Sequence, residues 1–299
     1  MKPLISVIVA ARNMERELPR TLHTLTPNYQ REVDGSEYDV VVVDCGSHVP
    51  IGPASVSQFG PNFRLIRQED SPSPARAINH AVSQSTADIV MICIDGARML
   101  SPRILTLTLA AFRAYANPIV ATLALHLGPK NQSISMLEGY CQASEDRLLE
   151  SIDWRSDGYE LFRISALAGS SSQGWFKPLG ESNCVAMRRM AYDQLQGLDE
   201  RFNTPGGGFV NLDFYRRACQ QTKDFVMLLG EGTFHQLHGG AATNIPLDHP
   251  RRQFFSQEYR RLKLMDYAPP QIHTTYLGSV PHQALPFLEM SASQARINQ

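Results

Sequence analysis

Nearly unbroken runs of apolar, mostly β-branched residues recur along the first half of the chain. The first covers residues 4–10, and Leu18, Leu22 and Leu25 after it fall three or four positions apart. A strand covered on both faces gives an unbroken apolar run, whereas one buried face of a helix repeats every three to four residues. The pattern therefore predicts a strand at residues 4–10 and an amphipathic helix over residues 15–26.

The same alternation continues along the rest of this half. Further strands are predicted at residues 38–43, 63–67, 89–94 and 119–125. Helices are predicted between them at residues 74–84 and 102–115. Strands that alternate with helices are typical of an α/β fold, in which a mostly parallel sheet is built through right-handed crossovers.

The second half is less regular, but it still contains recognisable elements. Helices are predicted at residues 136–150, 188–196, 211–222 and 250–266, and strands at residues 183–187 and 225–229. Three glycines, Gly206, Gly207 and Gly208, precede the helix at 211–222 and predict a loop there. The tail from Pro269 is rich in proline and is expected to be loosely packed.

Charge argues against one class of partner. The 299 residues include 28 Lys and Arg against 29 Asp and Glu, a formal net charge of −1. Because nucleic-acid binding draws on a basic excess, no nucleic-acid partner is expected.

Apolar length and cysteine usage indicate where the protein resides. No apolar run approaches the roughly 20 residues that span a bilayer, so no transmembrane segment is expected. Residues 1–6 lead directly into a strand and lack the pattern of a signal peptide. The five cysteines are widely spaced and form no Cys-x-x-Cys pair, which favours reduced thiols and a cytoplasmic location.

Two of the predicted strands are followed by aspartates, Asp44 and Asp95. Either residue alone could simply cap a helix or form a turn. In open α/β sheets, however, ligands bind just outside the carboxyl ends of the strands. Two carboxylates at such ends within one series of strands therefore indicate a ligand site.

Dehydrogenases and sugar nucleotidyltransferases share this alternation of strands and helices. Both place a glycine-rich turn after the first strand to approach a phosphate closely. Here that turn spans residues 10–15, Ala-Ala-Arg-Asn-Met-Glu, and contains no glycine. The sequence argues against both classes.

Six segments resemble family 2 glycosyltransferases of the GT-A fold in their order and spacing, over about residues 4–240. They are residues 5–13, 44–47, 77–79, 95–102, 197–202 and 207–217. The resemblance implies a Rossmann-like, mostly parallel sheet flanked by helices, with a smaller acceptor-side subregion. It divides the chain into a GT-A domain at 1–249, with a nucleotide-sugar half at 1–127 and an acceptor half at 128–249, and a C-terminal helix and Pro-rich tail at 250–299.

The resemblance also implies the activity. A sugar would pass from a nucleoside-diphosphate sugar to a saccharide or other hydroxyl acceptor, with inversion, in polysaccharide biosynthesis. The residues implied to bind the donor are Ala11, Arg12, Asp44, Ser47, Asn79, Asp95, Arg98, Gly207 and Gly208. Of these, Asp44 can accept a hydrogen bond from a nucleobase, Asn79 is expected near the base, and Arg12 offers charge-assisted donors.

The family's Asp-x-Asp stretch corresponds to Asp95 and the residues after it. Its later acid, which usually grips a magnesium or manganese ion, is replaced by Ala97, and Arg98 follows. A guanidinium can neutralise part of a diphosphate's charge, so Arg98 and a metal ion are alternatives here. His238, at the place where many GT-A enzymes complete the metal site, is expected to join Asp95 if an ion binds.

The family's catalytic base corresponds to Asn211, whose amide cannot take a proton from an acceptor hydroxyl. Asp213, two positions later, is ionisable and is the alternative base. The losses at residues 97 and 211 also leave open a degenerate protein that binds a nucleotide-sugar or a protein partner without catalysis.

Overall fold

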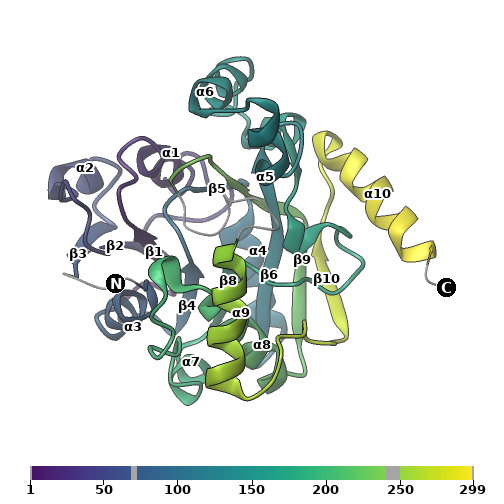
Figure 1. The fold of residues 1–299 in the computed structure, drawn as a ribbon. Coiled ribbons are helices and arrows are strands. Elements are labelled where there is room, and N and C mark those ends of the chain that lie inside the picture. The colour runs from purple at the N-terminus through teal and green to yellow at the C-terminus, as the bar shows by residue number, and fades with distance from the viewer. Residues whose placement is uncertain (1, 69–72, 240–249, 298–299) are drawn as a thin grey trace.

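A ten-stranded sheet runs through the molecule, with helices packed on both of its faces (Figure 1). This computed structural model describes residues 2–68, 73–239 and 250–297. The strands are β1 Ile5–Ala11, β2 Tyr38–Asp44, β3 Phe63–Arg67, β4 Ile89–Cys93, β5 Arg98–Leu100, β6 Ile119–Leu127, β7 Ser165–Leu167, β8 Cys184–Arg188, β9 Phe225–His235 and β10 Thr274–Gly278.

The sheet consists of two parallel groups joined by one antiparallel strand. Its main path is β10-β9-β6-β8-β4-β1-β2-β3, while β5 pairs with β9 and β7 with β6. Strands β1 to β4 are parallel to one another, as are β6, β9 and β10, and β8 is antiparallel to both of its neighbours. The expectation of a mostly parallel α/β sheet is confirmed.

The helices fill the connections between these strands. They are α1 Leu18–His23, α2 Pro53–Ser57, α3 Ala75–Ser83, α4 Ile104–Ala114, α5 Gln132–Ser135, α6 Gln142–Glu150, α7 Arg189–Gln194, α8 Val210–Gln221, α9 Pro250–Lys263 and α10 Leu285–Arg296. Short 3-10 turns are η1 Met136–Glu138, η2 Gly158–Ile164, η3 Gly169–Ser171, η4 Pro205–Gly207 and η5 His282–Ala284.

Alternate residues of the buried strands feed two hydrophobic cores, one on each face of the sheet. Val7 and Val9 of β1 belong to the core that α1 and α4 cover. Ile8 of the same strand belongs to the core that α3 and α8 cover. Because successive side chains of a strand point to opposite faces, a strand buried on both sides must be apolar throughout. This is the physical origin of the unbroken apolar runs.

The helix predicted at residues 136–150 is in fact interrupted. The chain forms α5 and η1 first, and α6 begins only at Gln142. Gly139 adopts φ 91°, a left-handed conformation that ends a helix and that glycine adopts without steric penalty. Hydrophobic spacing alone did not reveal this break.

The expectation of a loosely packed tail after Pro269 is wrong. Strand β10 pairs in parallel with β9 and extends the sheet beyond the domain boundary predicted at residue 249. Phe287 of α10 enters a hydrophobic core, and the Ser291 hydroxyl accepts a hydrogen bond from the Trp175 amide at 3.0 Å. Pairing occurs because β9 would otherwise expose a row of unsatisfied backbone groups at the sheet edge.

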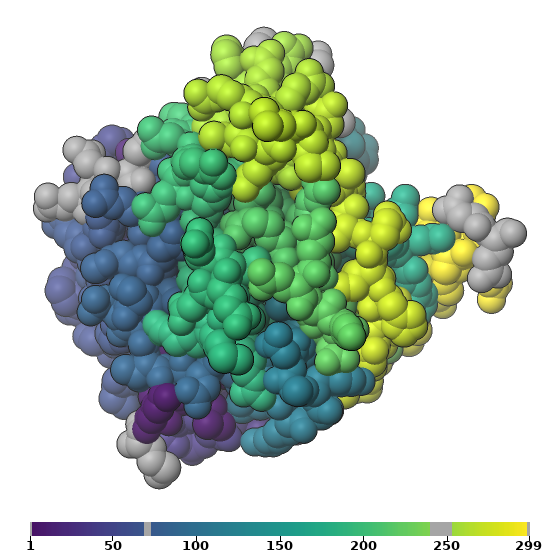
Figure 2. All heavy atoms as spheres, turned by 90° about the horizontal axis from the view of Figure 1, so that it is seen from below, coloured from purple at the N-terminus to yellow at the C-terminus, as the bar shows by residue number. Residues whose placement is uncertain are grey.

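Helix α9 lies on the face of the sheet that α3 and α8 cover, and its Tyr259 belongs to the same hydrophobic core (Figure 1). Figure 2 shows its yellow-green atoms projecting at one side of the molecule, beside the green part of the chain. Phe255 and Tyr259 of this helix are buried, so α9 packs through an aromatic face. Among the described residues, no helix combines the length and the apolar character needed to cross a membrane.

Candidate active site

A cleft of about 570 Å³ opens at the carboxyl ends of β1 and β4 and at the start of α8. Phe255 of α9 and Tyr267 close one side of it. The polar residues that line it are Arg12, Asp95, Arg98, His126, Asn131, Ser133, Ser170, Glu181, Asn183, Asn211, His238 and Tyr267. The position agrees with the rule that ligands bind outside the carboxyl ends of parallel strands.

The loops after β1 and β2 are fastened to each other behind the cleft. Asp44 is fully buried, and its carboxylate accepts hydrogen bonds from the amides of Ser47 at 2.9 Å and Ile51 at 3.1 Å. The Ser47 hydroxyl accepts in turn from the amide of Asn13 at 3.0 Å. Ala11 and Arg12 line the cleft, whereas Asp44 and Ser47 are not among its lining residues. The hydrogen bonds of Asp44 and Ser47 therefore stabilise the conformation of the loops after β1 and β2.

Asn79 does not reach the cleft either. Its amide donates to the Leu198 carbonyl and to Glu200, each at 2.9 Å. Its oxygen accepts from the Tyr192 hydroxyl at 2.6 Å and from the Leu198 amide at 2.9 Å. Because these bonds occupy the side chain fully, Asn79 joins α3 to the turn at 197–200, and the expected contact with a base is not supported.

The glycine loop presents its backbone to the cleft. Gly206, Gly207 and Gly208 all adopt positive φ, at 79°, 83° and 51°. Gly206 and Gly208 line the cleft, whereas Gly207 is packed against Pro74, where a Cβ atom would lie 2.9 Å from the proline Cδ. Left-handed backbone and close packing therefore both require glycine at residue 207.

Three possible metal ligands gather at the inner wall of the cleft, where Asp95 and His238 line it and His235 is buried behind them. Ligand atoms of Asp95, His235 and His238 all lie within 4.8 Å of one another. The two histidine Nε2 atoms are 3.2 Å apart, and His235 Nε2 lies 3.7 Å from Asp95 Oδ2. The sequence indicated Asp95 and His238 but missed His235, the last residue of β9, although a histidine pair three residues apart was a signal for it.

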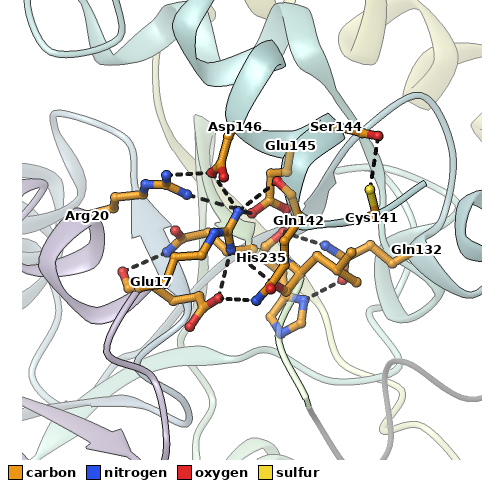
Figure 3. A network of polar contacts seen from close by, with 12 residues as sticks. Glu17, Arg20, Gln132, Cys141, Gln142, Ser144, Glu145, Asp146 and His235 are labelled. Carbon is orange, nitrogen blue, oxygen red and sulfur yellow. Dashed lines mark hydrogen bonds and ion pairs between the residues drawn. The ribbon is translucent and has the colours of Figure 1, made fainter.

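The surroundings keep these histidines in the form that binds metals. Gln132 Oε1 lies 2.7 Å from His235 Nδ1, a contact visible in Figure 3, and a carbonyl oxygen there fixes the proton on Nδ1 and frees Nε2. Burial lowers the pKa of His235 well below its ordinary value, and burial also lowers the pKa of His238. Neutral imidazoles and a carboxylate fit a divalent cation.

Arg98 stands beside this cluster. Its Nε lies 3.1 Å from Asp95 Oδ2, and its side chain is only 5% exposed. Its buried Nη1 has no hydrogen-bond partner among the described residues. Ala97 is fully buried and supplies only its amide, which donates to Asp95 Oδ1 at 3.0 Å. A positive charge thus lies next to the metal-ligand cluster, and its Nη1 can still donate hydrogen bonds to a ligand.

A buried acid fastens the segment that carries His238. Glu145 of α6 accepts a hydrogen bond from the Leu237 amide at 2.7 Å and pairs with Arg16 at 3.0 Å. Figure 3 shows Glu145 and Asp146 facing Arg20, so α6 reaches across to the helix after β1. Burial raises the pKa of Glu145 to about 7. The metal-ligand segment is therefore held by side chains more than 90 residues away in sequence.

Asn211 and Asp213 of α8 turn in different directions. Asn211 lines the cleft and donates to Glu181 at 2.6 Å. Asp213 is 2% exposed and forms ion pairs with Arg217 at 2.7 Å and Lys263 at 2.8 Å. Residues two apart in a helix do not share a face, so Asn211 can face the ligand only if Asp213 does not. The position of Asp213, buried in ion pairs and not lining the cleft, does not support its expected role as base.

Comparison with known proteins identifies the family. The sequence profile of glycosyl transferase family 2 matches residues 6–195, more than half of the chain. The chain belongs to glycosyl transferase family 2. No curated protein matches it significantly. The matched residues include the motif at Asp95 and end before the start of α8.

Solved structures share the fold of this family 2 protein. TarS of S. aureus, residues 1–349, is 15% identical with a TM-score of 0.52, covering 79% of this chain and 60% of its own. The same fragment in complex with UDP-GlcNAc is 16% identical with a TM-score of 0.53. That match covers 100% of this chain and 74% of the fragment. PcManGT, a mannosyltransferase from Pyrobaculum calidifontis in complex with GDP-Man and Mn2+, is 17% identical with a TM-score of 0.51. The match covers 98% of this chain and 70% of PcManGT. The GT-A architecture is thereby confirmed, while the chain spans 60% of the first TarS fragment.

Proposed function

We propose that this family 2 enzyme transfers a sugar from a nucleoside-diphosphate sugar to a hydroxyl acceptor, with inversion, and that a divalent cation at Asp95, His235 and His238 helps to hold the diphosphate. The observation that carries the proposal is the clustering of these three ligands within 4.8 Å, with Asp95 and His238 lining the cleft. Structures of similar fold hold GDP-Man with Mn2+ and UDP-GlcNAc, which supports a donor of this class.

Different residues around the metal-ligand cluster are proposed to bind different parts of the donor. A cation bound there neutralises diphosphate charge and stabilises the leaving group. Arg98 adds a guanidinium whose Nη1 is free to meet a phosphate oxygen. Arg12 and the backbone of Ala11 face the side of the cleft where the base and ribose are proposed to lie. The glycine loop at 206–208 approaches from the opposite half of the chain.

The remainder of the proposal concerns the acceptor and the setting. Acceptor binding falls to the half of the cleft formed by Ser170, Glu181, Asn183 and Tyr267. We propose a saccharide or another hydroxyl compound as the acceptor, with polysaccharide biosynthesis in the cytoplasm as the setting. All five cysteines are free thiols in the structure, which supports a reducing compartment.

Donor binding tests the proposal directly. Thermal unfolding should be measured with UDP-GlcNAc and with GDP-Man, each with and without Mn2+. A ligand at one hundred times its Kd stabilises a protein by about 2.7 kcal/mol, which is readily seen as a rise in Tm. Asp95→Asn and His238→Ala should remove the manganese-dependent part of that rise. His273→Ala, an exposed histidine of the tail, serves as the matched control and should keep it.

Two results would count against the proposal. No stabilisation by either donor in the presence of Mn2+ would refute a donor site for these nucleotide-sugars. Stabilisation without transfer to any of a panel of sugars, alcohols and water would instead favour the degenerate, binding-only protein.

A further inference from the structure

We propose that Glu181 is the general base of this enzyme, and that Asn211 positions it. The inference rests on the proposed glycosyl transfer and adds the residue that accepts the proton. It starts from one contact, in which Asn211 Nδ2 donates to Glu181 Oε2 at 2.6 Å. The family's base position, residue 211, thus carries an amide that holds a carboxylate from another segment.

Glu181 is the acid that remains for this task. Among the described residues that line the cleft, only Asp95 and Glu181 carry carboxylates. Asp95 is engaged by Arg98 at 3.1 Å and belongs to the metal-ligand cluster. Asp213 is held in ion pairs and is not a lining residue. Glu181 lies on the acceptor side and is partly exposed, so a hydroxyl group in the cleft can reach it.

The carboxylate is held firmly in place. Asn211 donates to it and also approaches Asn183 Oδ1 at 3.2 Å and the Ser182 carbonyl at 3.3 Å. The preceding residue, Gly180, is fixed on both sides, because its amide donates to the Ser170 carbonyl at 2.8 Å and its carbonyl accepts from the Tyr267 hydroxyl at 2.5 Å. A base held within hydrogen-bond reach of its substrate needs such support.

The electrostatic surroundings suit a base. Burial raises the pKa of Glu181, while the hydrogen bond from Asn211 and the charge of Arg98 lower it and the charge of Asp95 raises it. The pKa values of nearby Tyr215 and Tyr267 are raised, mainly by burial and also by the charge of Glu181, so both stay neutral near pH 7. A carboxylate with a raised pKa is a stronger base, and it is most effective when that pKa lies near the working pH.

The proposed step balances as follows. The hydroxyl oxygen of the acceptor forms a bond to the anomeric carbon of the donor with its own electron pair. The bond from that carbon to the diphosphate oxygen breaks, and its electron pair leaves with the nucleoside diphosphate. The hydroxyl proton passes to a carboxylate oxygen of Glu181, and the released nucleotide and the new glycoside are the products.

The first test uses donors whose nucleotide release can be followed with water as acceptor, namely UDP-GlcNAc and GDP-Man. Glu181→Gln keeps an oxygen for the Asn211 hydrogen bond, so the fold should be preserved. We expect it to lower kcat at least ~100-fold, the lower part of the general-base range, with little change in the Kd of the donor. Glu150→Gln, at the exposed end of α6, is the matched control and should leave both constants unchanged.

Azide separates a lost base from a damaged site. It is already an anion and attacks the anomeric carbon without giving up a proton. Glu181→Ala supplied with azide should therefore regain nucleotide release and form a glycosyl azide, whereas the wild type should gain little. Absence of this recovery in a variant that still binds donor would count against base catalysis by Glu181.

Two further variants test the role of Asn211. Since its hydrogen bond lowers the pKa of Glu181, Asn211→Ala should move the acid limb of the kcat profile to higher pH. The double variant Glu181→Asn, Asn211→Asp moves the carboxylate to the family's usual position and should recover part of the activity that Glu181→Asn loses. An unmoved acid limb would overturn the positioning role.

The outcomes keep the two proposals apart. Failure of the wild type to bind either donor with Mn2+ would overturn the proposed function. Wild-type turnover that persists in Glu181→Gln would overturn only the role of Glu181. Suppose that the wild-type protein binds donor but releases no nucleotide when water, azide or a panel of sugars is offered as the acceptor. That result would also count against a working base.

Discussion

Lys263, the last residue of α9, places its Nζ 2.8 Å from Asp213 Oδ1 on α8. The same ammonium lies 2.9 Å from Asp199 Oδ2, in the turn at 197–202. One lysine thus links α9, whose Phe255 lines the cleft, to the helix that carries Asn211. Asp213 is held by this link and by Arg217, which explains why it lies away from the cleft.

A structural role for Asp213 predicts an effect on stability. Asp213→Asn removes the carboxylate that Arg217 and Lys263 share, so that Arg217 loses this ion pair and Lys263 keeps only its pair with Asp199. The loss should be about 1–3 kcal/mol of unfolding free energy, between the values for exposed and for buried pairs. Urea unfolding checks this, and kcat at a temperature where the variant is folded should change by less than about threefold. A loss of turnover of ~100-fold in fully folded protein would restore Asp213 as the base.

Asp199 predicts how stability depends on pH. Hydrogen bonds from Arg201 and then Lys263 lower the pKa of Asp199 below its ordinary value of 3.8. The folded state therefore binds this proton less readily than the unfolded state does. The stabilisation is fully present above pH 3.8 and is lost as the pH falls through the lowered pKa.

The contribution of ionised Asp199 to the unfolding free energy can be measured by urea unfolding. The wild type and Asp199→Asn are compared at a series of pH values. The difference in unfolding free energy should be largest near neutral pH and should shrink in acid. A difference that is constant over the whole range would show that Asp199 stabilises by packing and not by its charge. Glu150→Gln again provides the control, because its side chain is exposed.

Metal removal tests the division of labour between the cation and Arg98. We expect EDTA to weaken donor binding at least ~10-fold, or ~1.4 kcal/mol, and added Mn2+ to restore it. Arg98→Lys keeps the charge but loses the planar fork, so it should weaken donor binding while leaving the manganese effect intact. Isothermal titration calorimetry measures both. Full donor affinity in EDTA, together with its loss in Arg98→Lys, would show that the guanidinium replaces the ion.

The glycine loop predicts a combined loss of stability and of donor affinity. Gly207→Ala forces an alanine into φ 83° and places its Cβ 2.8 Å from Val210 Cγ1. Strained left-handed backbone costs about 1–3 kcal/mol, and the loop beside the cleft should shift. Both Tm and donor affinity should therefore fall. Gly52→Ala is the matched control, because Gly52 has φ −74° and its Cβ would meet only Ser55 Oγ at 4.0 Å.

The sequence by itself determined the alternation of strands and helices. Burial on both faces imposes unbroken apolar runs, and such runs are visible without any knowledge of neighbours. The same local logic placed Asp95 just after a buried strand and Gly207 in a turn, which the structure bears out, but it did not predict that Arg98 begins the short strand β5. Family order then added the GT-A fold.

Only the tertiary structure decided which side chains meet. Glu181 lies 30 positions before Asn211, yet the two are in contact. Glu181 precedes β8 and Asn211 is in the first turn of α8, and both elements begin at the same edge of the sheet. His235, the last residue of β9, likewise meets Asp95 in the loop after β4, 140 positions earlier in the chain. The direction in which Asp213 points depends on Lys263, 50 positions away. Contacts of this kind are set by the packing of distant segments, which no local pattern of residues specifies.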